Sequence, residues 1–306
     1  YGVSNGAINV NSNNNILMGD NSFGFILTDG GTFSNLSTTG KVIMGKDSTY
    51  VYTTNPNTNV FNASDIVMTG DENTGFNILG GTLVNNGNIL GGTGVGDTGI
   101  YIENGTVVNN GNMDLGDSLV LYNSDGSLDE VNSNYAVGIY GVNSNITTAA
   151  GSTIKLGQNG VGLYSESKEQ DKTKQPVLTN NGTITSSAPG AFGIYTINTN
   201  TINNGLIELT GDGSTGIVVQ NSTVTNNGTI IMRGENSSGI HALSGAIIDN
   251  QGSIQIYGHN SNGLLTASGI VVLNSGNIYI DSAVSATSST TKIDTVTSSF
   301  VKPLIR

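Results

Sequence analysis

Short stretches of alternating apolar and polar residues follow one another along most of the chain, and Gly, Asn and Asp separate them. Residues 229–232 form one such stretch, and closely similar ones return at 253–256 and 277–280. Alternation with a period of two, bounded by residues that favour turns, is typical of β-strands and not of helices. The pattern therefore predicts an all-β chain.

The predicted strands recur in groups of three. Copies of one apolar position, at Ile207, Ile230, Ile254 and Ile278, lie 23 or 24 residues apart. We count eleven third stretches, of which the first begins at Ile16. Three short strands cannot bury a face alone, so successive units must coil and stack on one another. The repeat predicts a right-handed parallel β-helix of about eleven rungs, on the order of 50 Å long at a strand spacing of ~4.8 Å.

The third stretch of each unit indicates which side faces the core. Two of its columns are almost uniformly apolar: Ile154, Ile184, Ile207, Ile230, Ile254 and Ile278, and, two residues later, Leu156, Leu209, Met232, Ile256 and Ile280. The column between them varies: Asp114, Lys155, Thr185, Glu208, Ile231, Gln255 and Tyr279. Successive side chains in a strand point to opposite faces, so we expect the uniform columns inside and the variable one outside.

A recurring asparagine stands two residues before the Gly that ends the second stretch. It is found at Asn85, Asn109, Asn180, Asn203, Asn226, Asn250 and Asn274. It shares a face with the apolar residue two positions earlier, such as Leu83, so we predict an inward ladder of stacked amides that hydrogen bond between rungs. The alternative is a loop asparagine that adopts left-handed backbone geometry.

The repeat predicts one solenoid domain over residues 1–282, with insertions at 117–135 and 165–176. The second insertion region concentrates six of the chain's 32 charged residues: Glu166, Lys168, Glu169, Asp171, Lys172 and Lys174. Insertions in solenoids often form the binding face. Residues 283–306 are rich in Ser and Thr and lack Gly, which predicts a linker or an end cap.

Composition narrows the function classes. Acidic residues outnumber basic ones 22 to 10, and the formal net charge is −12. Such a chain has no basic patch for phosphates, so we expect no nucleic-acid partner. Without cysteine there are no disulfides or thiolate metal sites. We expect neither a metal nor a cofactor.

Gly-Ile-Tyr segments such as 138–140 and Asn-Asn-Gly corners such as 226–228, in a cysteine-free acidic solenoid, resemble the passenger domains of Gram-negative autotransporters of the type V secretion pathway. The repeats resemble those of large fusobacterial outer-membrane adhesins of the RadD type, from Gly2 to about Ser282. The resemblance implies display on the bacterial cell surface, as an extracellular passenger exported by a C-terminal β-barrel that these residues do not include. It also implies attachment to a host-cell or bacterial surface protein or glycan.

Two further functions remain open besides adhesion. The segment could be a structural stalk that spaces a distal head from the outer membrane. It could also be a β-helix polysaccharide lyase or hydrolase, which needs clustered carboxylates or a basic residue beside them. We expect the outward Asp114, Lys155 and Glu208 to lie on separated rungs, and therefore predict no catalytic residues and no enzyme.

The candidate ligand-binding residues lie on the first stretch and in the second insertion. We expect Tyr101, Tyr140, Tyr164 and Tyr195 to form an outward column, which suits sugars or protein partners. Lys168, Lys172 and Lys174 border it. The alternative is an aromatic ladder that only stiffens the solenoid.

Overall fold

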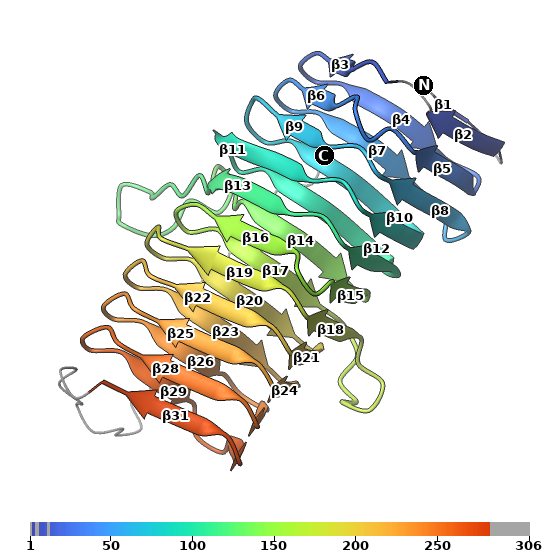
Figure 1. The fold of residues 1–306 in the computed structure, drawn as a ribbon. Coiled ribbons are helices and arrows are strands. Elements are labelled where there is room, and N and C mark those ends of the chain that lie inside the picture. The colour runs from blue at the N-terminus through green and yellow to red at the C-terminus, as the bar shows by residue number, and fades with distance from the viewer. Residues whose placement is uncertain (1, 4–5, 11–12, 282–306) are drawn as a thin grey trace.

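The chain winds eleven times around one axis into a rod, as the computed structural model shows for residues 2–3, 6–10 and 13–281 (Figure 1). All pairings between the named strands are parallel, and no helix occurs among the described residues. The predicted all-β parallel solenoid of about eleven turns is confirmed. The predicted linker or cap at 283–306 lies outside the described residues.

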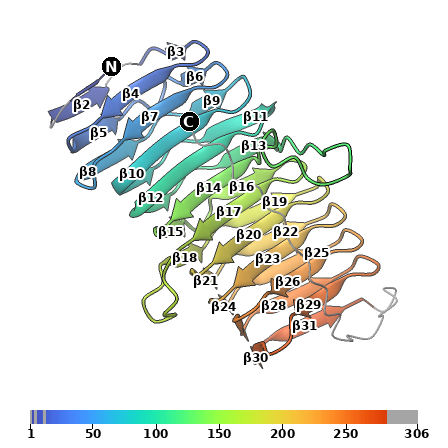
Figure 2. The ribbon, with the colours of Figure 1, turned by 180° about the vertical axis from the view of Figure 1, so that it is seen from behind.

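Each coil contributes strands to three strips that run along the rod (Figures 1 and 2). The first strip comprises β1 (Gly2–Val3), β4 (Phe23–Leu27), β7 (Thr49–Thr53), the first half of β10 (Thr74–Asn85), the first half of β12 (Thr98–Asn109), β14 (Val137–Val142), β17 (Val161–Glu166), β20 (Phe192–Ile197), β23 (Thr215–Gln220), β26 (Ser238–Ala242) and β29 (Asn262–Thr266). The second comprises β2 (Gly6–Val10), β5 (Gly31–Asn35), β8 (Thr58–Asn62), the second halves of β10 and β12, β15 (Asn145–Thr148), β18 (Val177–Asn180), β21 (Asn200–Asn203), β24 (Thr223–Asn226), β27 (Ile247–Asn250) and β30 (Val271–Asn274).

The third strip is a separate eleven-stranded sheet. It comprises β3 (Ile16–Met18), β6 (Val42–Met44), β9 (Ile66–Met68), β11 (Ile89–Val95), β13 (Met113–Asp117), β16 (Thr153–Leu156), β19 (Thr183–Ser186), β22 (Leu206–Leu209), β25 (Thr229–Met232), β28 (Ser253–Ile256) and β31 (Asn277–Ile280). The first two strips merge into one sheet because β10 and β12 each continue through the corner between them.

The core follows the predicted alternation. Ile230 and Met232 are fully buried, whereas Ile231 between them is partly exposed. The inward residues of all three strips pack into one apolar cluster that runs along the rod. Removal of these side chains from water is the main stabilising contribution in a fold of this kind.

The corner between the second and third strips contains a ladder of buried asparagines. Asn203 Nδ2 donates to Asn226 Oδ1 at 2.8 Å, and Asn226 Nδ2 donates to Asn250 Oδ1 at 2.8 Å. Equivalent bonds at 2.7–2.9 Å join Asn85 to Asn109, Asn180 to Asn203 and Asn250 to Asn274. Of the seven expected members, six are buried and Asn274, on the last described coil, is exposed.

The sequence pattern missed part of this ladder. Asn62 Nδ2 donates to Asn85 Oδ1 at 2.8 Å, so the ladder extends one coil further. Thr148 interrupts it between Asn109 and Asn180, and its Oγ1 donates to Asn180 Oδ1 at 2.7 Å. Asn62 was missed because no Gly follows it two residues later.

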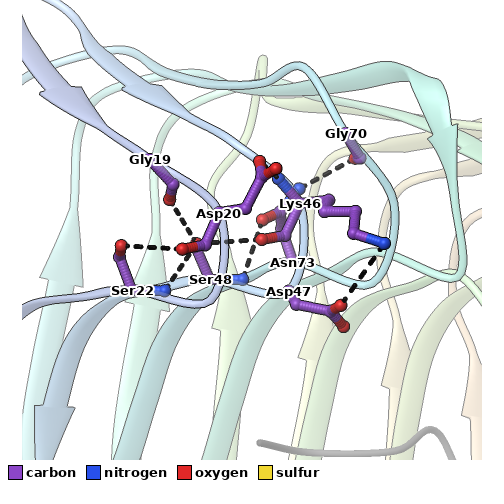
Figure 3. A network of polar contacts seen from close by, with 8 residues as sticks. All are labelled: Gly19, Asp20, Ser22, Lys46, Asp47, Ser48, Gly70 and Asn73. Atoms are coloured by element: carbon purple, nitrogen blue, oxygen red, sulfur yellow. Dashed lines mark hydrogen bonds and ion pairs between the residues drawn. The ribbon is translucent and has the colours of Figure 1, made fainter.

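A second set of side chains stabilises the corner that leads from the third strip into the first. Figure 3 shows it on three coils: Ser48 Oγ accepts the backbone N–H of Ser22 at 3.0 Å, and Asn73 Oδ1 accepts that of Ser48 at 3.1 Å. The residue just before each, such as Asp47 with φ of 53°, has left-handed backbone geometry. These side chains satisfy backbone groups that the turn leaves unpaired.

Candidate functional site

The expected tyrosine column exists and runs along the first strip. Tyr101, Tyr140, Tyr164 and Tyr195 are register partners on four successive coils. Successive ring centroids are 5.2, 4.7 and 5.5 Å apart; the first two pairs meet edge to face and the third is stacked. These distances are within the range of favourable aromatic pairs.

The column lies outside the main core, as expected, but it does not form an exposed surface, so the expectation of exposed tyrosines was wrong. Tyr140, Tyr164 and Tyr195 are only 3, 2 and 3% exposed, and Tyr101 is half-buried. They belong to a second apolar cluster outside the main core: Tyr135, Val137, Tyr140, Val161, Tyr164, Tyr195 and Val218, with Val120, Leu128 and Phe192 packed against it. The rings cover one another, and apolar residues of the first insertion join them. The geometry matches the alternative of a stiffening aromatic ladder.

The tyrosine hydroxyls are held by carboxylates. Tyr140 donates to Glu166 Oε1 at 3.1 Å and Tyr164 to Glu166 Oε2 at 3.2 Å, so one carboxylate joins two coils. Burial, reinforced by the adjacent Glu166 charge, raises the pKa of both hydroxyls well above the usual value. The same causes, with Glu103 as the nearest carboxylate, raise the pKa of Tyr101. The hydroxyls keep their protons and act as donors.

The first insertion is a hairpin between β13 and β14 whose base is held by hydrogen bonds, and it is drawn as the green loop in Figure 1. Leu119 and Asn134 exchange backbone hydrogen bonds at 2.8 and 2.7 Å, and Asn134 Nδ2 donates to Gly96 O at 3.1 Å. Beyond this base, Tyr122 is 69% exposed and Val131 is 90% exposed. Sequence reasoning named neither residue, although the apolar run 120–122 was a signal for Tyr122.

The second insertion lies between β17 and β18 and projects from the opposite edge of the rod (Figures 1 and 2). Lys172 Nζ donates to Asn221 Oδ1 at 2.9 Å, and Gln175 Nε2 donates to Asn221 O at 2.8 Å. Asn200 Nδ2 donates to Lys172 O at 2.7 Å. The loop is therefore attached to the two following coils.

The three lysines of this loop have different surroundings. Lys172 binds Asn221, whereas Lys174 Nζ lies 3.1 Å from Asp171 Oδ2. Lys168 is exposed, and together with Lys174, Asn143 and other residues it lines a shallow hollow of about 430 Å³. The structure thus brings Lys168 and Lys174 together and uses Lys172 as an anchor.

Charged side chains on the outer face of the third strip are paired. Lys155 Nζ lies 3.0 Å from Asp114 Oδ2, and Arg233 Nε lies 3.0 Å from Glu208 Oε1. The expectation that Asp114 and Lys155 lie on separated rungs was wrong: they are direct register partners. With the first insertion between them, the two residues are 41 positions apart in sequence, which hides this contact.

Within the described ranges, no group of three His, Cys, Asp or Glu side chains could hold a metal ion. The part of the chain that the structure describes also contains no helix long and apolar enough to cross a membrane.

Comparison with known proteins gives one family. The family model of the BigA third pectate lyase-like domain matches residues 32–252, well over half of the chain. No curated protein and no solved structure matches. BigA is an autotransporter-like surface protein, and "pectate lyase-like" describes a relationship of fold. The β-solenoid described above therefore belongs to the family of the BigA third pectate lyase-like domain.

Proposed function

We propose that this chain is an adhesive segment of a bacterial surface protein, displayed outside the outer membrane, that attaches to a host-cell or bacterial surface protein or glycan. Its family supports a surface location. The observation that carries the adhesive role is the hairpin at 118–136, which presents Tyr122 and Val131 to solvent. Exposed apolar groups on a rigid support mark interaction sites.

The hairpin is preorganised at both ends. Ala136 N–H donates to Ser118 Oγ at 2.9 Å, and Ser118 Oγ donates to Asn159 O at 2.8 Å, which joins the base to the next coil. Near the tip, Asp129 Oδ1 accepts the N–H groups of Val131 and Asn132 at 3.2 and 3.1 Å. A loop that is already ordered loses little conformational entropy on binding, so more of the contact energy appears as affinity.

The second insertion supports the same role. Its three anchoring bonds to Asn200 and Asn221 fix the loop backbone, while Lys168 and Lys174 border the shallow hollow. Glu169 lines the same hollow, so the edge of the hollow presents charges of both signs to a partner.

Binding of the fluorescently labelled 306-residue chain to host and bacterial cells tests the proposal. Truncation of exposed aromatic anchors at an interface commonly weakens binding tenfold or more. We therefore expect Tyr122→Ala combined with Val131→Ser to reduce cell binding by about tenfold. Phe23→Ala, at a residue 49% exposed near the start of the rod, is the matched control and should leave binding unchanged. Equal binding by the parent and the double variant would reject the hairpin as the adhesive element.

The second candidate is the structural stalk, and the buried tyrosine ladder favours it. Tyr101 to Tyr195 and the asparagine ladder both run parallel to the rod axis and join coil to coil. A chain that binds no cell type, yet unfolds cooperatively at high temperature, would support this function instead.

We also propose that the fold is used without catalysis. The outward carboxylates of Asp114 and Glu208 do not form a cluster, because β16 and β19 lie between the strands that carry them, β13 and β22. Incubation of the chain with polygalacturonate should yield no unsaturated or reducing ends. Release of either product would restore the lyase or hydrolase alternative.

A further inference from the structure

The C-terminal half of the third strip carries an outward patch that includes the Arg233–Glu208 ion pair and lies outside both insertions. Glu208, Ile231, Gln255 and Tyr279 form one file of register partners over β22, β25, β28 and β31. Tyr257 follows β28 directly, beside this file. The two tyrosines are among the few aromatic residues on the outer side of this sheet.

Contacts between side chains hold the patch in one arrangement. Arg233 Nε donates to Glu208 Oε1 at 3.0 Å, and its guanidinium carbon lies 4.7 Å from the centre of the Tyr257 ring. Tyr257 donates its hydroxyl proton to Gln255 Oε1 at 3.1 Å. The Tyr257 and Tyr279 rings are 5.7 Å apart and inclined at 50°. The rings are therefore fixed before any ligand arrives, which lowers the entropic cost of binding.

A shallow hollow of about 490 Å³ lies over this arrangement. Its lining consists of Ser253, Gln255, Tyr257, Asn277, Ile278 and Tyr279. Tyr279 is 50% exposed. Aromatic rings are thus combined with amide and hydroxyl groups, and the lining contains no charged side chain.

This chemistry selects the ligand class. A saccharide presents C–H faces that pack on aromatic rings and hydroxyls that bond to amides, so it satisfies both kinds of group. An ionic ligand finds no counter-charge in the hollow, because Arg233 is engaged by Glu208. The chain's net charge of −12 also disfavours acidic glycans.

We propose that this patch is a binding site for a neutral oligosaccharide. The site rests on the proposed function, since it supplies the glycan contact of a surface adhesin, and it is distinct from the hairpin at Tyr122. The sugar rings lie across β28 and β31, with Tyr279 and Tyr257 beneath them and Gln255 and Asn277 bonded to hydroxyls.

The test uses the full 306-residue chain on an immobilised panel of neutral and acidic oligosaccharides, followed by calorimetry with the neutral oligosaccharide bound best. Loss of a central aromatic contact costs tenfold or more in affinity, so Tyr279→Ala should weaken binding by about tenfold. Tyr257→Phe keeps the ring and should change affinity by less than about threefold, and Gln255→Ala should lie between these two. Phe23→Ala, 49% exposed at the other end of the rod, should bind like the parent.

Several outcomes would overturn the site: no neutral oligosaccharide bound by the parent, binding of acidic ones only, or equal losses for Phe23→Ala and Tyr279→Ala. Unchanged circular dichroism for each variant shows that the fold survives, and Gln255→Ala provides a test that leaves both rings in place. Cell binding separates this inference from the proposed function. Cells bound through Tyr122 without any oligosaccharide binding would reject this site alone, whereas oligosaccharide binding through Tyr279 without cell binding would reject only the adhesive role.

Discussion

The backbone N–H of Asn73 donates to Asp97 Oδ1 at 2.8 Å, so the two side chains occupy the same corner on successive coils. The side-chain Nδ2 of Asn73 donates to Gly70 O at 2.8 Å. By contrast, the second carboxylate oxygen of Asp97, Oδ2, is buried and has no hydrogen-bond partner. Burial raises the pKa of Asp97 to about 7, and the bond from Asn73 opposes this only in part. The corner suits a neutral side chain with a donor, which a protonated Asp97 provides.

Stability should therefore fall as pH rises through the range between the two pKa values of Asp97. An unfolded Asp titrates near 3.9. Between about pH 4 and pH 7 the folded chain keeps a proton that the unfolded chain has lost, so this contribution is complete below pH 4 and absent above pH 7. The difference between these two pKa values corresponds to an upper limit of about 4 kcal/mol on the effect. Chemical denaturation at intervals from pH 4 to pH 8 measures it.

Asp97→Asn should remove this pH dependence, because an amide supplies the donor without a charge. We expect the variant to be more stable than the parent at pH 8, with a difference that shrinks toward pH 5. Asp212→Asn is the control: its exposed Oδ1 accepts the N–H of Glu235 at 2.8 Å, and its replacement should alter stability little at either pH. If the free energy of unfolding changes by the same amount between pH 5 and pH 8 in the parent and in Asp97→Asn, Asp97 is ionised throughout this range and the prediction is wrong.

A charge should destabilise the chain much more at Ile230 than at Ile231. Ile230 is fully buried and Ile231 faces outward on the same strand. Ile230→Asp places an unpaired carboxylate in the core and should lower the free energy of unfolding by several kcal/mol, whereas Ile231→Asp should change it by less than about 1 kcal/mol. Thermal melts of the two variants provide the comparison, and equal shifts would contradict the assigned faces.

The sequence pattern was sufficient for such positions because the strand period alone decides whether Ile230 points in or out. It was insufficient where exposure depends on what lies outside the coil. The Tyr140 side chain does point away from the main core, but the rings of Tyr101 and Tyr164 pack against it, and insertion residues such as Val120 join the same cluster. The contact between Asp114 and Lys155 was hidden for a related reason, since repeat spacing finds neighbours only when no insertion separates the coils. Local alternation thus fixes the fold, whereas surface sites depend on irregular segments.

The buried tyrosine ladder gives an expectation opposite to that for an exposed binding face. Tyr164 packs against Tyr140 and Tyr195 and is 2% exposed, so Tyr164→Ala leaves a cavity. Truncation of a buried aromatic residue typically costs 3–5 kcal/mol, and we expect a loss of about 3 kcal/mol by chemical denaturation. Tyr164→Phe keeps the ring and loses the hydroxyl bond to Glu166, so its cost should be near 1 kcal/mol. A Tyr164→Ala variant as stable as the parent would contradict the burial of Tyr164 and support an exposed tyrosine column instead.

Loss of a buried asparagine from the ladder should destabilise the chain more than loss of the exposed asparagine next to it. Asn226 is buried and bonds to both Asn203 and Asn250, so Asn226→Ala leaves a donor on one neighbour and an acceptor on the other without their partners. Each unsatisfied buried group costs about 1–3 kcal/mol, so we expect a total loss of at least about 2 kcal/mol. Asn227 is exposed and donates to Asn204 Oδ1 at 2.8 Å, and Asn227→Ala should cost less than about 1 kcal/mol because water replaces that bond. Denaturant unfolding of the two adjacent variants measures the contrast. Similar losses would mean that the amide bonds between coils contribute no more inside the rod than on its surface, and the ladder would then only shape the corner.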